Sequence, residues 1–98
     1  MMYNLNQQIE NQEYNQLQLQ KWVKSEAFEI LSVSLEKDAV FPEHTSPKDA
    51  QLIVLEGEIT FHINNRSFSI GRQQHFSFPK EEPHWVSAVQ NSKFLIIR

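Results

Sequence analysis

Two histidines in strand-like segments are the residues of this chain best suited to chemistry. His44 lies in PEHTSPKDAQLIVLEGE, residues 42–58, and His84 lies in FSFPKEEPHWVSA, residues 76–88. An unperturbed imidazole has a pKa of about 6.5, so it exchanges a proton near neutral pH, and its neutral form is a common metal ligand. The two histidines could therefore form a proton-binding site or part of a metal site.

The other reactive side chains are predicted to lie elsewhere. His75 alternates with Phe76, and His62 alternates with Phe61, so neither histidine is expected to face the interior or to bind a metal. The sequence contains no cysteine, no G-x-S-x-G elbow and no glycine-rich phosphate loop. Among the carboxylates, strand parity leaves only Glu56 open as an inward acid or base.

Composition limits the class of protein. Ninety-eight residues, 40% hydrophobic and 21% charged, predict one globular domain, and a chain this short often gains stability as a homodimer. The net charge of −3 and the lack of a basic run argue against nucleic acid as a partner. No apolar run reaches the roughly 18 residues of a membrane span, and no signal peptide is recognisable. We therefore predict a cytoplasmic protein with no nucleic-acid or membrane partner.

The first sixteen residues differ from the rest of the chain. Residues 1–16 are rich in Asn and Gln without a sustained apolar stripe, so we predict a polar, solvated N-terminal arm. From Leu17 apolar and polar residues alternate, which favours a strand, although a helix over 15–27 competes. Segments rich in Val, Ile, Phe and Thr then alternate with turn signals. The further predicted strands are 28–35, 51–56, 58–63, 67–70, 75–78, 85–89 and 93–97.

Turn residues connect these strands into an all-β domain. Asn64-Asn65-Arg66 separates two strands with matching apolar faces, and asparagine tolerates positive φ, so a hairpin is expected there. Gly57 is expected to let the chain turn tightly after a strand. Many short strands without intervening helices predict a β-barrel or double-sheet jelly roll over residues 17–98.

The two histidine-bearing segments, taken together, resemble the two motifs of the cupin family. Its first motif reads H-x-H, three or four residues, E, six residues, G; its second reads G, five residues, P-x-G, two residues, H, three residues, N. The resemblance covers residues 28–98. It implies a cupin-like β-barrel, also described as a double-stranded β-helix or jelly roll.

The resemblance retains only part of the family's metal-binding set. Counting back from Gly57, His44 matches the first histidine, whereas Ser46 and Ala50 occupy the positions of the second histidine and the glutamate. His84 matches the histidine of the second motif. The other positions of that motif hold Gln73, Pro79, Glu81 and Ala88, of which only Pro79 matches. Since the family usually holds its metal with three histidines and a glutamate, the resemblance implies a degenerate site.

This loss of ligands leads to our functional expectation. A hydroxyl and a methyl group do not replace an imidazole and a carboxylate for a divalent first-row metal, so no tightly held cofactor is predicted, and His44 and His84 would capture such a metal only weakly. We predict instead that the barrel mouth binds an unknown small, partly apolar molecule. The residues predicted to line this mouth are His44, Ser46, Ala50, Leu52 and His84.

Two other classes of function remain open from the sequence. The resemblance implies as one alternative a metal-dependent dioxygenase or isomerase with a recruited ligand such as Glu56, or a metal-free isomerase or epimerase with His44 or His84 as base. A structural or protein-interaction barrel is the other, and a mouth filled with large side chains would indicate it. Trp22 and Trp85 are predicted to face outward and to serve in packing or in a homodimer interface.

Overall fold

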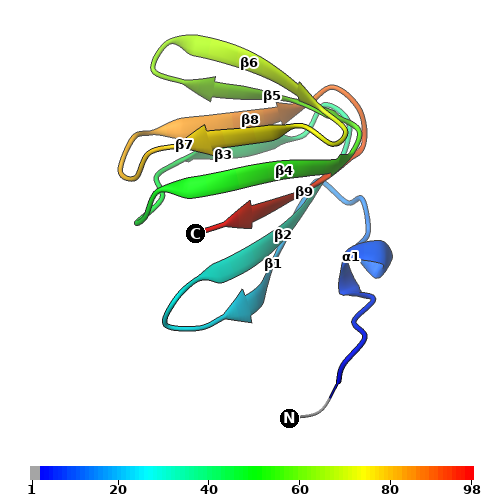
Figure 1. The fold of residues 1–98 in the computed structure, drawn as a ribbon. Helices are drawn as coiled ribbons and strands as arrows, with labels where there is room; N and C mark the ends of the chain where they lie inside the picture. Colours follow the sequence, from blue (N-terminus) through cyan, green and yellow to red (C-terminus); the bar gives the residue numbers. More distant parts are fainter. Residues whose placement is uncertain (1–2) are drawn as a thin grey trace.

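Two antiparallel sheets face each other across a single core in the computed structural model, which describes residues 3–98 (Figure 1). One sheet has the order β1-β2-β9-β4-β7 and the other the order β3-β8-β5-β6. The strands of the first sheet are β1 (Leu17–Lys24), β2 (Glu29–Leu35), β9 (Ser92–Ile97), β4 (Ala50–Glu56) and β7 (His75–Phe78). Those of the second are β3 (Val40–His44), β8 (His84–Ala88), β5 (Glu58–Ile63) and β6 (Arg66–Gly71).

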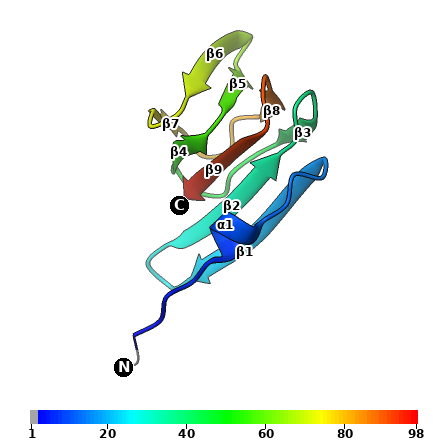
Figure 2. The same ribbon diagram turned by 90° about the vertical axis from the view of Figure 1, so that its right-hand side faces the viewer.

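The chain passes repeatedly from one sheet to the other, as a jelly roll requires. The predicted all-β jelly roll is confirmed. Figures 1 and 2 show the β1–β2 hairpin at one end of the molecule and the β5–β6 hairpin at the other. The elements that carry His44 and His84, β3 and β8, are neighbours in the second sheet.

Each strand predicted by alternation is present, with ends that agree within one residue. The competing helix over 15–27 is wrong, because residues 17–24 pair with β2 along their whole length. Strand β3 is absent from the ranges predicted by alternation, although the segment around His44 was expected to be strand-like. Its sequence, VFPEH, contains a proline and shows no alternation of buried and exposed positions, and it forms an edge strand, where a missing N–H is tolerated.

The hairpin between β5 and β6 is confirmed. Ile63 pairs with Arg66, so the loop is Asn64-Asn65, and these residues have φ of 53° and 59°. Two consecutive residues with positive φ form the type I′ turn, whose twist matches that of the flanking strands. The sequence signal was the asparagine pair between two alternating apolar runs.

The core lies between the inner faces of the two sheets, and its side chains are supplied by alternate residues of nearly every strand. In β5, for instance, Ile59 and Phe61 are 0% and 1% exposed, while the intervening Thr60 is only half-buried. The largest fully buried core side chains are Phe61, Phe94, Leu35, Leu52 and Ile59. Four partly buried residues pack against this cluster, and three of them are phenylalanines: Leu17, Phe41, Phe68 and Phe76.

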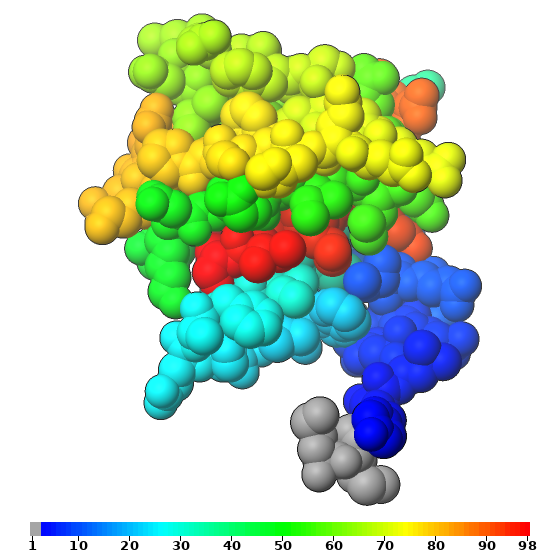
Figure 3. Space-filling model, viewed as in Figure 1, coloured from blue at the N-terminus to red at the C-terminus, as the bar shows by residue number. Residues whose placement is uncertain are grey.

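The N-terminal segment lies against the outer face of the first sheet (Figure 3). It contains α1 (Gln8–Asn11), and the Gln12 side chain, 7% exposed, donates to the Ser32 carbonyl at 3.1 Å. Lys93 of β9 donates through Nζ to the Ile9 carbonyl at 2.8 Å. The expectation of a fully solvated arm is therefore wrong at these contacts, and residues 1 and 2 of the predicted arm lie outside the described residues. Within residues 3–98 no helix is long and apolar enough to cross a membrane.

Candidate functional site

The structure brings His44 and His84 into direct contact at one end of the second sheet. His44 is the last residue of β3, His84 is the first of β8, and the two are paired in the strand register. Their Nε2 atoms lie 3.1 Å apart, and the ring planes are inclined by 69° with centroids 4.3 Å apart. The two imidazoles, whose ring nitrogens face each other, are thus 40 positions apart in the sequence.

Backbone carbonyls determine which ring nitrogens carry protons. Nδ1 of His44 lies 2.7 Å from the Pro42 carbonyl, and Nδ1 of His84 lies 2.9 Å from the Glu82 carbonyl. Since a carbonyl only accepts, both Nδ1 atoms donate, and both neutral rings present an Nε2 lone pair. The contact between the Nε2 atoms is then a hydrogen bond only when the pair holds one additional proton.

Aromatic rings surround the pair and limit access to it. His84 is 1% exposed and stacks on Phe61 with a centroid distance of 5.1 Å, while Phe78 meets it edge-on at 4.6 Å. His44 stacks on Phe41 at 4.1 Å but remains half-buried. Solvent and small molecules therefore approach the pair from the His44 side.

The other three predicted mouth residues lie deeper. Ser46 is 1% exposed just beyond the end of β3, where its hydroxyl donates to the Lys48 carbonyl at 2.6 Å. Ala50 and Leu52 are both 0% exposed in the core of the first sheet. All three side chains are covered by other residues in this conformation.

An arginine that the sequence analysis missed lies beside the site. Arg98 donates through Nη1 to Ser46 Oγ at 3.4 Å and through Nε to Glu29 Oε1 at 2.7 Å. The hydrogen bond from Arg98 holds the pKa of the Glu29 carboxyl below its usual range. No local motif marks Arg98, because its place at the site depends on the pairing of β9 with β2 and β4.

The remaining candidates lie away from the pair. Glu56 is exposed and accepts a hydrogen bond from Tyr14 of the N-terminal segment, so it is not the inward carboxylate left open by strand parity. His75 is exposed on β7 and bonds Gln51. His62 lies on the opposite face of β5 from Phe61, as alternation predicted.

Burial lowers the pKa of His84 below its ordinary value. The nearby positive charges of His44 and Arg98 lower it further, against the opposing effect of the hydrogen bond to the Glu82 carbonyl. Because the space between the two Nε2 atoms has room for one proton, the folded pair takes up fewer protons on acidification than the two imidazoles of an unfolded chain. Folding is therefore coupled to proton release from this pair.

This coupling predicts a pH-dependent stability. The unfolded chain binds more protons below its histidine pKa of about 6.5, so the free energy of unfolding should fall as the pH decreases below that value, by up to about 1.4 kcal/mol per pH unit for each proton. Urea unfolding from pH 7.5 to 5.5 measures this slope, and His84→Asn should reduce it. The exposed His75→Asn variant is the control, and an equal slope in wild type and His84→Asn would contradict the prediction.

The donor set does not fit a tightly held metal. No group of three or more His, Cys, Asp or Glu side chains among residues 3–98 is arranged to hold an ion. The site offers two imidazole nitrogens, with a covered hydroxyl at Ser46 and a methyl at Ala50, whereas protein metal sites of this type normally supply three or four ligands. Of these groups, the two imidazoles are the ones whose nitrogens can exchange a proton near neutral pH.

Comparisons with known proteins agree with this architecture. The family model described as "Cupin domain" matches residues 31–97, more than half of the chain. No curated protein sequence gives a significant match.

Solved structures extend the similarity to nearly the whole chain. An RmlC-like cupin protein from Desulfovibrio desulfuricans superposes with a TM-score of 0.83 at 24% identity, covering 99% of this chain and 93% of that one. A conserved protein of unknown function from Streptococcus pyogenes gives 0.77 at 26% identity, covering 87% and 75%. A cupin 2 conserved barrel domain protein from Leptotrichia buccalis superposes with a TM-score of 0.82 at 26% identity. The match covers 97% of this chain and 46% of the Leptotrichia protein.

Proposed function

Because this chain belongs to the cupin family, we propose that it binds a small, partly apolar molecule with a weakly acidic group at the His44–His84 pair. No tightly held metal takes part. The observation that carries this proposal is the 3.1 Å approach of two Nε2 atoms whose Nδ1 atoms are both committed to carbonyls. The pair is one proton short of a hydrogen bond.

A weak acid supplies what the pair lacks. Transfer of its proton to an Nε2 atom completes the N–H···N hydrogen bond and leaves a positive charge on the pair. This charge attracts the anion of the ligand, although no ring N–H remains free to bond it. His84 is buried and His44 is half-buried, so the anion of the ligand approaches the charged pair from the His44 side. Arg98 also lies near the pair, but its ion pair with Glu29 at 2.7 Å balances its charge, so the attraction for an anion comes mainly from the protonated pair.

The apolar part of the ligand has aromatic surroundings. Phe41 is half-buried and stacks on His44, so its ring continues the surface that a ligand meets on the accessible side of the pair. Small carboxylic acids with a hydrocarbon or aromatic body combine both features. The proposal therefore favours such acids over sugars or free phosphate at this site.

Calorimetric titration with benzoate, and with benzamide as its neutral counterpart, tests this proposal. We expect benzoate to bind with proton uptake that depends on the ionisation heat of the buffer, and benzamide to bind at least about tenfold more weakly, since it lacks the charged contact. His44→Ala should weaken benzoate binding by about tenfold or more. His44 is half-buried, so this variant is expected to fold.

His75→Ala serves as the matched control, because it removes an exposed histidine that lies away from the pair. Equal binding by His44→Ala and wild type would contradict the proposed site. Elemental analysis of protein purified without a metal-affinity step checks the metal-free part of the proposal. Retention of stoichiometric metal through dialysis would overturn it.

A further inference from the structure

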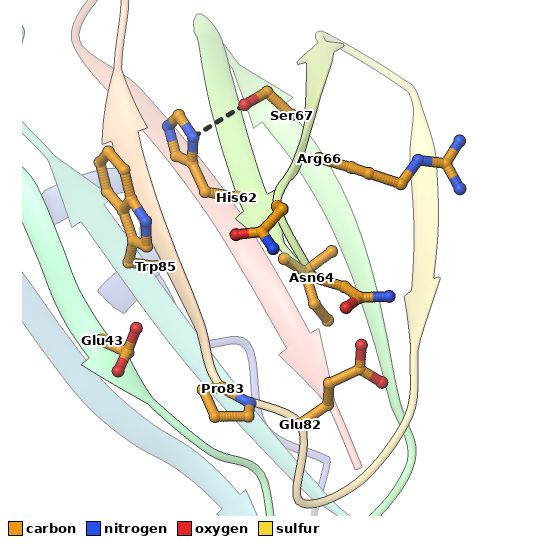
Figure 4. A pocket seen from close by; sticks show the side chains of 10 residues that line it. Glu43, His62, Asn64, Arg66, Ser67, Glu82, Pro83 and Trp85 are labelled. Atoms are coloured by element: carbon orange, nitrogen blue, oxygen red, sulfur yellow. Dashed lines mark hydrogen bonds between the residues drawn. The ribbon is translucent and has the colours of Figure 1, made fainter.

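A hollow lies on the outer face of the second sheet, on the opposite side from the imidazole pair. Its volume is about 510 Å³, within the roughly 300–1,000 Å³ typical of small-molecule sites. It lies where the β5–β6 turn approaches the start of β8 (Figure 4). The lining residues that matter here are Glu43, His62, Asn64, Arg66, Glu82 and Trp85.

A fixed aromatic surface forms one side of this hollow. Trp85 and His62 are cross-strand partners, and their rings stack with centroids 3.5 Å apart and planes inclined by 6°. The ring nitrogens of His62 form hydrogen bonds with the hydroxyls of Ser67 at 3.0 Å and Ser87 at 3.1 Å. The indole therefore rests on a ring that is itself held at two points, and 36% of Trp85 remains exposed. A ligand that stacks there immobilises little additional side chain.

The polar side chains around the hollow include both carboxylates and an amide. Among the lining residues drawn in Figure 4, the hydrogen bond present joins His62 to Ser67, so the carboxylates of Glu43 and Glu82 and the amide of Asn64 are not bonded to one another. The guanidinium of Arg66 is directed away from Trp85 and lies 5.1 Å from the centre of the Phe68 ring. Carboxylates accept hydrogen bonds, while the amide both donates and accepts.

This combination selects against a simple anion, which the two carboxylates would repel. It matches a molecule with several hydroxyl groups, because each hydroxyl donates to a carboxylate and accepts from an amide. A sugar ring also presents a flat C–H face that covers the apolar indole. We propose that this hollow binds a neutral sugar unit of pyranose size, with its C–H face on Trp85 and its hydroxyls on Glu43, Asn64 and Glu82.

This site is separate from the imidazole pair. Glu43 and His44 are consecutive in β3, so their side chains leave opposite faces of the strand, and Trp85 and His84 are related in the same way in β8. The inference therefore does not rest on the function proposed for the pair. His75→Ala, which removes an exposed histidine from β7 of the other sheet, is a matched control that should leave sugar binding unchanged.

Saturation-transfer NMR with methyl β-D-glucopyranoside and methyl β-D-galactopyranoside tests the inference, with choline as a cationic probe. We expect at least one glycoside to bind, and Trp85→Ala to weaken it by about tenfold. Trp85→Phe retains an aromatic face and should lose only a few-fold, which separates loss of stacking from loss of folding. In Trp22→Phe, where Trp85 is the remaining tryptophan, binding should change the indole emission.

Glu43→Gln distinguishes a sugar site from a cation site. The amide retains hydrogen bonding to hydroxyls, so glycoside binding should change by less than about fivefold, whereas an ammonium ligand would lose its charge partner. Binding of choline alone, with loss in Glu43→Gln, would overturn the inference in favour of a cation site. Absence of glycoside binding to the wild type would also overturn the inference. A change in the oligomeric state of Trp85→Ala, measured by sedimentation, would overturn it in favour of an interface between two copies of the chain.

Discussion

Replacing Phe61 with alanine is expected to lower the free energy of unfolding by about 3–5 kcal/mol. Phe61 is 1% exposed in β5, and its ring meets those of Phe76 at 4.7 Å, Phe78 at 4.9 Å and His84 at 5.1 Å. Truncation removes its apolar burial and leaves a cavity that rings from two sheets cannot fill by small shifts. A domain of this size has a total stability of only about 5–15 kcal/mol, so the loss is a large fraction.

Urea unfolding at neutral pH, followed by tryptophan emission and circular dichroism, measures this change. Phe28→Ala is the matched control, because Phe28 is 41% exposed and should lose less than about 1 kcal/mol. A loss in Phe61→Ala as small as that of the control would mean that Phe61 is not central to the core. The same variant removes the ring on which His84 stacks, so benzoate binding should weaken as well.

Gly57→Ala is the second substitution with a large expected effect. Gly57 joins β4 to β5 with φ of +80°, and a Cβ there would lie 2.4 Å from the Asn91 carbonyl oxygen, 2.4 Å from Ser92 Oγ and 2.9 Å from Ser92 Cα. Two of these three atoms belong to the backbone, which has to move to make room. The Ser92 hydroxyl also accepts a hydrogen bond from the Glu58 amide, and a shift would disturb it. We expect a loss of about 2–4 kcal/mol.

Gly71→Ala is the control for Gly57→Ala. A Cβ on Gly71 meets only the flexible side chain of Gln74, at 3.6 Å, and its backbone is outside the left-handed region. Alanine at such a position changes stability by about 1 kcal/mol or less. Differential scanning calorimetry of the two variants makes the comparison directly, and equal melting temperatures would contradict our account of the Gly57 turn.

The strands followed from local sequence because each has one buried face. In residues 58–63 apolar and polar side chains alternate, which predicts burial of every second residue in β5. The Asn64-Asn65 pair predicts a turn with positive φ, as the structure has it. Strand β3 shows no such alternation, because it lies at a sheet edge with Pro42 in its middle. The burial of Gln12 could not be predicted from neighbouring residues either. It depends on hydrogen bonds to Ser32, which lies 20 positions away in the sequence.

The candidate site was predictable only in outline. Residue type singled out His44 and His84, and spacing within the two motifs indicated a shared location. The structure places them as register partners on the neighbouring strands β3 and β8, rather than on opposite sides of the barrel. The 3.1 Å contact, the carbonyl partners of both Nδ1 atoms and the presence of Arg98 depend on where distant backbone groups lie. The stack of Trp85 on His62 likewise depends on the register of β5 against β8.

The amino-acid sequence by itself determined the class of fold, most strands, the tight turns and the identity of the two central histidines. The reason is that periodic burial and backbone preferences depend on the types of residues close together in the chain. Tertiary structure alone decided the tautomers of those histidines, their access to solvent and the hollow beside Trp85. These properties come from pairs of groups far apart in the chain, and only the closing of the two sheets sets their distances and their desolvation.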